Sequence, residues 1–333
     1  MNKKAFVTGA SGFVGGALVE RLLADGWDVV ALVRTGSDTG KLQSLGVRLV
    51  VGDVCQPDGL VEAIQGADVV FHCAALTGVG HSINDFHQVI TQGTKTLLNA
   101  AQIAGAKRFV FVSSVAVYEL EGVSSCDEQQ PLLTSSIDPY ANAKVAAETA
   151  CLDAHRKGNI EVSIVRPVFI YGPGDRRGGF LPELVAMMAK GKFKLIGGGK
   201  NRIPLVYISD LTDILVRCAV RPESSGQIYN ACSKGAPRWR ELAKTLCCEL
   251  NVRKPGSVSV GLVRCVAGLL ESLARIKLLK TLPLSKAAVN LLALDVSFPT
   301  GKAERELGSE SEVGFAEGIA CCLPMLKELQ QVK

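Results

Sequence analysis

Apolar positions in the first half of the chain follow two different spacings. Short, nearly continuous runs of Val, Ile, Leu and Phe predict buried strands, whereas apolar residues three or four positions apart predict helices. The strands predicted in this way are Ala5–Thr8, Asp28–Val33, Val47–Val51, Asp68–His72, Arg108–Ser113 and Glu161–Arg166. The helices predicted between them include Phe13–Ala24, Leu60–Ile64 and Phe86–Ala104. Apolar strands separated by helices indicate a parallel sheet with both faces covered.

The pattern changes after Arg166. Segments 171–179 and 197–199 are rich in glycine, segments 205–208 and 227–230 resemble strands that return to the sheet, and 258–294 is mainly helical and rich in leucine. Right-handed crossovers between parallel strands give a doubly wound α/β sheet of the Rossmann type. We therefore predict a Rossmann domain over residues 1–170, with returning segments near 205–230, and a smaller, mostly helical C-terminal region over 171–333 that binds the substrate.

A glycine-rich turn joins the first predicted strand to the first predicted helix. It reads Thr8-Gly9-Ala10-Ser11-Gly12-Phe13-Val14-Gly15. Glycines permit a tight turn and let a pyrophosphate approach the backbone, and the positive end of the helix dipole attracts that group. A plain strand-to-helix turn is the alternative. We predict a dinucleotide site whose loop residues are Gly9, Ser11, Gly12, Phe13, Val14 and Gly15.

Composition narrows the class of protein. The chain has 333 residues, of which 47% are hydrophobic and 21% charged, as in an ordinary folded protein. Its formal net charge is +5 without a run of Lys or Arg, so no nucleic-acid partner is expected. The 11 cysteines contain no CxxC pair, which predicts free thiols in a reducing cytoplasm. The four histidines lack a metal-binding spacing, and no apolar run is long enough to predict a membrane span.

Further motifs follow the glycine turn in order along the chain. They are Gly52-Asp53-Val54, Phe71-His72-Cys73-Ala74-Ala75, Ser113-Ser114, Tyr140-Ala141-Asn142-Ala143-Lys144, Arg166-Pro167 and Tyr171-Gly172-Pro173-Gly174-Asp175. Together with the turn they resemble the extended short-chain dehydrogenase/reductase family, within the NAD-dependent epimerase/dehydratase superfamily. The similarity is greatest to 3β-hydroxysteroid dehydrogenase and dihydroflavonol reductase-like members and covers essentially the whole chain. It implies an NAD(P)-dependent oxidoreductase that forms a homodimer through the helix of Tyr140 and its neighbour.

The resemblance also implies which residues hold the cofactor. They are Asp53 at the adenine with Val54 beside it, Ala74 and Ala75 near the phosphates and the nicotinamide ribose, Tyr140 and Lys144 at that ribose, and Pro167 and Val168. The second strand ends at Arg34, where no carboxylate is available for the ribose hydroxyls of NAD. An arginine there, with Lys41 further on, suits a 2′-phosphate. We therefore favour NADP(H), with NAD(H) bound beside an exposed Arg34 as the alternative.

Tyr140 and Lys144 are four residues apart, so a helix places them on one face. Hydride transfer to a carbonyl leaves an oxygen that needs a proton, which Tyr140 could donate. Lowering the pKa of a phenol from ~10 to ~7 takes about 4 kcal/mol, which we expect from the Lys144 ammonium and an oxidised nicotinamide. The resemblance selects Ser114, rather than Ser113, as the serine that binds the substrate oxygen. It places Ile90 where the family commonly has an asparagine that relays protons, so a different proton route is expected.

The residue after the sixth predicted strand bears on the substrate. Sugar-nucleotide enzymes of this family often have an asparagine there to bind the diphosphate, whereas this chain has Phe169. An apolar residue in that place favours an apolar substrate. We expect an alcohol dehydrogenase or ketoreductase acting on a small hydrophobic molecule, steroid-like or polycyclic. Two alternatives stay open: a sugar-nucleotide epimerase or dehydratase, and a non-catalytic protein that senses the cofactor.

Residues 258–294 combine leucines with an excess of basic side chains. The basic residues are Arg264, Arg275, Lys277, Lys280 and Lys286, against the single acid Glu271 before residue 294. Such a stretch could rest on an anionic membrane surface as a peripheral contact. It could also form a helical lid over the substrate with a solvated outer face. The two interpretations are compatible if the substrate is a lipid.

Overall fold

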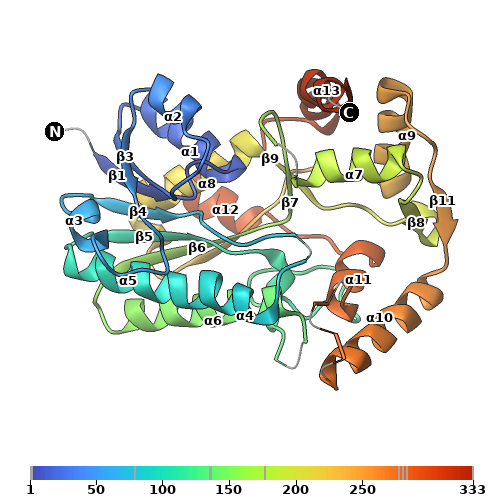
Figure 1. The fold of residues 1–333 in the computed structure, drawn as a ribbon, viewed down its shortest axis with the longest axis horizontal. Helices are drawn as coiled ribbons and strands as arrows, with labels where there is room; N and C mark the ends of the chain where they lie inside the picture. The colour runs from blue at the N-terminus through green and yellow to red at the C-terminus, as the bar shows by residue number, and fades with distance from the viewer. Residues whose placement is uncertain are drawn as a thin grey trace.

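The computed structural model describes residues 3–78, 80–134, 137–175, 178–276, 278–279, 281–282 and 284–331. Its centre is a seven-stranded parallel sheet in the order β10-β6-β5-β4-β1-β2-β3 (Figure 1). The strands are β1 (Lys4–Thr8), β2 (Asp28–Val33), β3 (Arg48–Val51), β4 (Val69–His72), β5 (Arg108–Val112), β6 (Glu161–Pro167) and β10 (Ile228–Ala231). The order reverses at β1, which lies between β2 and β4. Doubly wound sheets bind their ligands at such a reversal, beyond the carboxyl ends of the strands.

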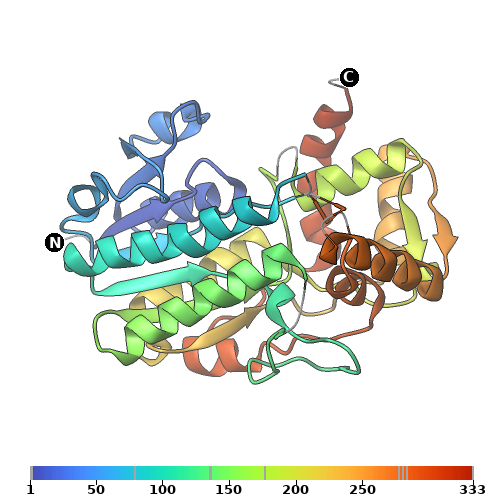
Figure 2. The same cartoon turned by 60° about the horizontal axis from the view of Figure 1, so that its bottom comes forward.

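Helices cover both faces of this sheet, as two views show (Figures 1 and 2). One face carries α1 (Phe13–Ala24), α2 (Gly40–Ser44), α8 (Ile208–Val220) and α12 (Gly301–Leu307). The other face carries α3 (Leu60–Ile64), α5 (Gly93–Ile103) and α6 (Pro139–Arg156). Because strand side chains alternate between the faces, each face forms its own apolar core with its helices. The predicted Rossmann sheet is confirmed.

The C-terminal region lies beyond the carboxyl ends of the central strands and has a third apolar core (Figures 1 and 2). Its two small sheets pair β7 (Phe169–Tyr171) with β9 (Leu205–Tyr207), and β8 (Lys194–Ile196) with β11 (Gly256–Val258). Its helices are α7 (Phe180–Ala189), α9 (Trp239–Leu250), α10 (Val260–Arg275), α11 (Lys286–Ala293) and α13 (Phe315–Gln331). The 3-10 turns among the described residues are η2 (Val115–Val117), η3 (Gly197–Gly199) and η4 (Pro222–Ser224).

Two predicted segments differ from their expected course. The segment expected to return at 227–230 joins the central sheet as β10, but the one at 205–208 forms β9, which pairs with β7 outside that sheet. The reason is that the chain leaves the sheet right after β6: the Phe169 amide donates to the Pro204 carbonyl at 3.2 Å. The predicted helix at 86–104 begins with α4 (Ile83–Phe86) and a π-helical turn, η1 (His87–Gln92).

A chain of buried hydrogen bonds ties the carboxyl ends of β1 and β4 to α5. His72 is fully buried, with Nδ1 2.8 Å from the Thr8 hydroxyl and Nε2 3.0 Å from the Thr94 hydroxyl. The Thr8 hydroxyl accepts from the Ala74 amide, and the Thr94 hydroxyl donates to the Ile90 carbonyl. Every one of these bonds is satisfied when His72 is neutral and carries its proton on Nε2. Burial lowers the pKa of His72 to about 3, in agreement with that neutral state.

His72→Gln is expected to lower the free energy of unfolding by about 2 kcal/mol at pH 7, because buried hydroxyls lose their partner. Since the pKa of His72 is lowered on folding, only the unfolded wild type takes up a proton as the pH falls below 6.5. The difference between wild type and variant should therefore shrink between pH 6.5 and pH 4. Urea unfolding of both proteins across this range measures it, and a difference independent of pH would contradict the neutral buried histidine.

Candidate active site

The glycine turn after β1 brings two backbone segments into direct contact. A Cβ atom on Gly9 would lie 2.7 Å from the Ala74 amide nitrogen, and one on Gly15 would lie 2.2 Å from the Gly9 carbonyl oxygen. Gly9 also has a φ of +70°, which side chains rarely tolerate. Only glycine fits either position. The turn, the start of α1 and the end of β4 therefore meet without intervening side chains.

The N-terminus of α1 is open beside this turn. No side chain in the described part of the chain caps it, and its first turn contains no acid. Ser11 and Gly12 are exposed, Phe13 and Val14 are half-buried, and Gly15 is buried. The first amides of a 12-residue helix are thus left to meet an anion, with the helix dipole favouring negative charge. The bare backbone and free amides have the chemistry that the pyrophosphate of a dinucleotide needs.

The residues predicted at the adenosine end lie beyond β2 and β3. Arg34 is exposed directly after β2. Asp53 accepts the Cys55 amide through Oδ1 at 2.9 Å, and Val54 is buried beside it. Lys41, on α2, pairs with the Glu20 carboxylate of α1. Arg34 is thus the predicted cation that remains exposed at the end of β2, whereas Lys41 is already engaged.

The remaining cofactor residues lie at the carboxyl ends of β4 and β6. Ala74 follows β4 and donates its amide to Thr8, and Ala75 beside it is exposed. Pro167 pairs with Ala231 in the sheet, and the buried Val168 donates its amide to the Ala231 carbonyl at 3.1 Å. These positions share the edge of the sheet at which the glycine turn lies.

The predicted catalytic residues come together at the end of β5. Tyr140 lies in the first turn of α6, which Asp138 caps by accepting the Ala141 amide at 3.0 Å. The Tyr140 phenol is hydrogen-bonded to the Ser114 hydroxyl. The Lys144 ammonium, one turn further along α6, lies 5.9 Å from the Tyr140 ring centroid and donates to the Val112 carbonyl at 2.7 Å. The geometry thus joins all three side chains.

Burial dominates the protonation of this group. It lowers the pKa of Lys144 to about 8, although the nearby Glu148 carboxylate opposes the shift. It raises the pKa of Tyr140 to about 12, against the hydrogen bond from Ser114. We expected the pKa of Tyr140 to be lowered toward 7. The side chains of the protein alone do not lower it. At neutral pH Tyr140 is a protonated phenol, ready to donate its proton.

The structure also places Ser113 and Ile90, two positions that the sequence analysis singled out. Ser113 is buried, and its hydroxyl has no hydrogen-bond partner among the described residues, so Ser114 is the serine that reaches Tyr140. Ile90 is buried in η1 and offers no side-chain proton. Its neighbour Thr91 donates its hydroxyl to the Ala143 carbonyl at 3.1 Å, which holds η1 against α6.

A buried ion pair beside Lys144 was not predicted. The Arg166 guanidinium forks onto the Glu148 carboxylate, at 2.9 Å from Nε to Oε1 and 2.5 Å from Nη2 to Oε2, and both side chains are 2% exposed. Arg166 also lies over the Tyr118 ring, 4.6 Å from its centroid. The spacing carried a signal, because Glu148 follows Lys144 by four residues, as Lys144 follows Tyr140. The pair fixes α6 to β6 directly below the catalytic side chains.

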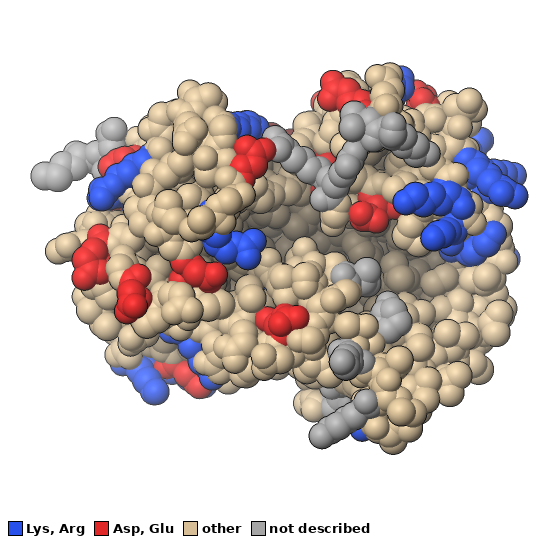
Figure 3. Space-filling model, in the orientation of Figure 1, with Lys and Arg blue, Asp and Glu red and all other residues tan. Residues whose placement is uncertain are grey.

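A cleft separates the central sheet from the C-terminal region. Figure 3 shows it as a hollow between the left and right parts of the molecule. Half-buried Phe169 on β7 stacks on Phe180 at 4.9 Å, and its ring lies edge-on to Trp239 at 6.2 Å. The Trp239 indole N–H is buried without a partner among the described residues. Among the described residues, no group of three His, Cys, Asp or Glu side chains is placed so that it could hold a metal ion.

Lys144→Met is expected to raise the free energy of unfolding at pH 7 by about 2 kcal/mol, because it removes a buried charge while Glu148 keeps Arg166. The pKa of Lys144 is lowered from 10.5 to about 8, so folding expels its proton between these values. The wild type therefore gains stability as the pH rises from 8 to 10.5, and the advantage of the variant should shrink. Denaturant unfolding at pH 7 and pH 10 tests this, with exposed Lys95→Met as the control. A less stable Lys144→Met protein would refute it.

Comparisons with known proteins agree with this geometry. The chain is 33% identical over 320 residues to the "4-hydroxy-2-methyl-3-oxo-4-farnesyl-3,4-dihydroquinoline-1-oxide ketoreductase" of Stigmatella aurantiaca, covering 95% of this chain and 94% of that protein. It is 30% identical to the "3beta-hydroxysteroid-dehydrogenase/decarboxylase isoform 1" of Arabidopsis thaliana, covering 94% of this chain and 77% of that protein. The solved structure of DesIV, a dTDP-glucose 4,6-dehydratase from Streptomyces venezuelae with NAD and TYD bound, matches with a TM-score of 0.78 at 26% identity, covering 98% of this chain and 97% of that one.

A family model covers most of the described sheet and the whole predicted site. The model of the NAD dependent epimerase/dehydratase family matches residues 5–232, from β1 to just past β10. Its match includes the glycine turn, Tyr140, Lys144 and the end of β6. The relatives are reductases and dehydrogenases, so the chain is an NAD(P)-dependent oxidoreductase. By sequence, fold and site, the chain belongs to the NAD dependent epimerase/dehydratase family.

Proposed function

We propose that this oxidoreductase reduces a carbonyl group of a hydrophobic substrate, or oxidises the matching alcohol, with Tyr140 as the proton donor or acceptor. The observation that carries the proposal is the contact of the protonated Tyr140 phenol with Ser114, beside the charged Lys144. A phenol held in this way can donate a hydrogen bond to a substrate oxygen, and Ser114 can donate a second one.

The reaction divides between the cofactor and the chain. A reduced nicotinamide, when bound, supplies a hydride to the carbonyl carbon of the substrate. The electron pair of the C=O double bond moves to oxygen, which takes the proton of Tyr140 and leaves a tyrosinate. The nearby Lys144 ammonium stabilises that negative charge in a buried setting where water screens little. Ser114 stabilises the negative charge that develops on the substrate oxygen.

The preference for an apolar substrate rests on the aromatic cluster of Phe169, Phe180 and Trp239. A diphosphate needs charged or N–H donors, whereas rings provide apolar surface. The names of two relatives, a ketoreductase of a farnesyl-bearing quinoline oxide and a hydroxysteroid dehydrogenase, support the same class. A sugar-nucleotide epimerase or dehydratase is the second candidate, because DesIV shares the fold.

The preference for NADP(H) rests on Arg34. Its side chain is exposed at the end of β2, and Asp53 is occupied by the Cys55 amide. A guanidinium can bind a 2′-phosphate through two charge-assisted hydrogen bonds. NAD(H), which family members bind, remains the alternative.

Tyr140→Phe is expected to lower kcat by about 10²- to 10⁴-fold, since the proton donor is lost. Ser114→Ala should lower kcat as well, whereas the matched control Ser113→Ala should retain activity because its hydroxyl has no partner. Substrates come from a panel of apolar ketones and alcohols, followed by nicotinamide absorbance. Unchanged turnover by Tyr140→Phe would refute the mechanism. Micromolar binding of dTDP or UDP, with no turnover of any apolar substrate, would favour the sugar-nucleotide alternative.

Arg34→Ala is expected to weaken NADPH binding by about tenfold or more, through loss of a charge-assisted contact, and to leave NADH binding nearly unchanged. Cofactor fluorescence titration measures both dissociation constants. Arg48→Ala, at the opposite end of the parallel strands, is the matched control and should change neither. Equal NADPH affinity of wild type and Arg34→Ala would count against the choice of NADP(H).

A further inference from the structure

Helix α10 presents an apolar face to solvent. Leu262 is 58% exposed, Val266 44%, Leu269 62% and Ile276, which follows the helix, 65%. These residues recur at intervals of three, four and seven positions, so they lie on one side of the helix. Isolated exposed apolar residues are common on protein surfaces, whereas these four form a row along one side of a helix and its end.

The polarity of α10 is the reverse of that of an ordinary surface helix. Its single acid, Glu271, is only 8% exposed and accepts the backbone N–H of Lys286, the first residue of α11, at 2.7 Å. Ala267 is fully buried on the same side. The carboxylate and the small residue thus face the protein, Leu262 and Leu269 face outward, and the other two leucines of the helix are half-buried. Packing against α11 therefore leaves the apolar stripe uncovered.

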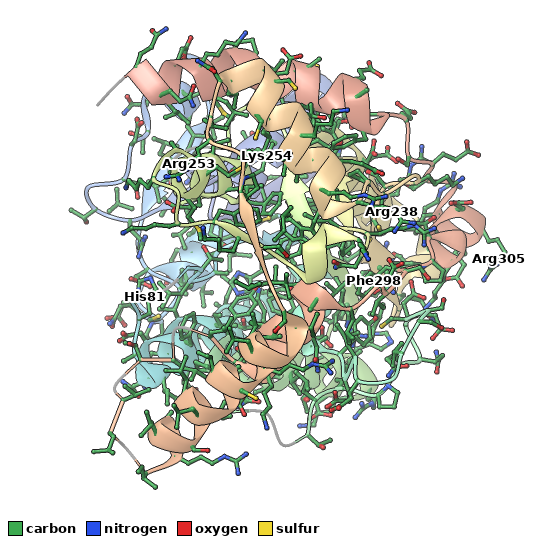
Figure 4. All side chains as sticks on the ribbon, turned by 90° about the vertical axis from the view of Figure 1, so that its right-hand side faces the viewer. His81, Arg238, Arg253, Lys254, Phe298 and Arg305 are labelled. Carbon is green, nitrogen blue, oxygen red and sulfur yellow. The ribbon has the colours of Figure 1, made fainter. Side chains whose placement is uncertain are left out.

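The charges around the stripe are positive. Arg275 and Lys286 are exposed, and Arg264 is half-buried beside Asn290. Of the described residues between 260 and 286, none is an exposed acid. Figure 3 shows this part of the surface, at the lower right, as mostly uncharged and without exposed acidic side chains in view. In Figure 4, α10 forms the lower edge of the molecule, away from the labelled Arg253 and Lys254. Lys277 and Lys280 lie outside the described residues.

Helix α10 is coupled to the catalytic side chains through α11. Ser285 caps α11 by accepting the Ala288 amide and donates its hydroxyl to the Asp138 carboxylate at 2.6 Å. Asp138 in turn caps α6 two residues before Tyr140. The apolar face of α10 is therefore the outer surface of a pair of helices that borders the reaction centre.

We propose that α10 docks on an anionic lipid bilayer, with its apolar face at the boundary between headgroups and acyl chains and its cations against the headgroups. Interfacial helices bind membranes in this way. No helix among the described residues is long and apolar enough to cross a bilayer, so the contact is with one leaflet. The docking goes beyond the proposed ketone reduction and does not depend on it.

The size of the face argues against a second copy of the chain as its occupant. The 16 residues of α10 extend about 24 Å, and one side of a helix about 10 Å wide offers roughly 240 Å². A stable protein interface buries about 800 Å² on each partner. A fluid lipid surface needs no matching contour, and its negative charge complements Arg275 and Lys286.

The test is sedimentation of the full chain with vesicles of phosphatidylcholine alone or mixed with phosphatidylglycerol. The wild type should bind the mixed vesicles, and more tightly than the neutral ones. The double variant Leu262→Glu/Leu269→Glu should reduce this binding by about tenfold or more, because two exposed apolar side chains become anionic. Ile103→Glu, which changes a helical residue 64% exposed on α5, is the matched control and should bind as the wild type does.

Three results would overturn the docking proposal. They are no binding of the wild type to the mixed vesicles, equal loss in the Ile103→Glu control, and a wild-type dimer that the double variant dissociates while neither protein binds vesicles. Thermal unfolding of each variant confirms that it is folded, and since the replaced side chains are exposed, little change is expected. Because the readout is binding and not turnover, failure here leaves the assignment of Tyr140 untouched, and an inactive enzyme would leave the docking result valid.

Discussion

Gly9 allows the backbone of the turn after β1 to lie against the amide of Ala74, with no room for a Cβ between them. The Thr8 hydroxyl accepts a hydrogen bond from the same amide, and it is itself hydrogen-bonded to His72. These contacts set the distance between the open N-terminus of α1 and the end of β4. Because pyrophosphate recognition relies on backbone amides, a shift of this turn would displace the cofactor relative to Tyr140.

A second constraint is the burial of charge beneath the reaction centre. Lys144 is 2% exposed, and its charge is only partly offset by the nearby Glu148 carboxylate, which forms its ion pair with Arg166. Such a cluster is a poor source of stability, because desolvation costs nearly as much as the ion pairs return. It instead fixes α6 against β6, so that Tyr140 meets Ser114 at the end of β5. The cluster therefore contributes more to the position of Tyr140 than to the stability of the fold.

The C-terminal region lies across the cleft from the central sheet. After β6 the chain leaves the central sheet, which places Phe169 among aromatic rings. The hydrogen bond from Ser285 to Asp138 attaches α11 to the start of α6. The same attachment turns α10 so that it buries Glu271 and exposes leucines. The packing of α10 against α11 thus determines which side chains this part of the protein exposes.

The sequence by itself determined the Rossmann sheet, the glycine turn and the pairing of Tyr140 with Lys144. These depend on local periodicity and on spacing within one turn or one helix, which neighbouring residues express directly. Tertiary structure alone decided the rest. The partnership of Glu148 with Arg166 and the outward leucines of α10 depend on residues distant in sequence, and no local pattern predicts which face another element will cover. The raised pKa of Tyr140 has the same origin, because burial is a property of the packed chain and not of the residue.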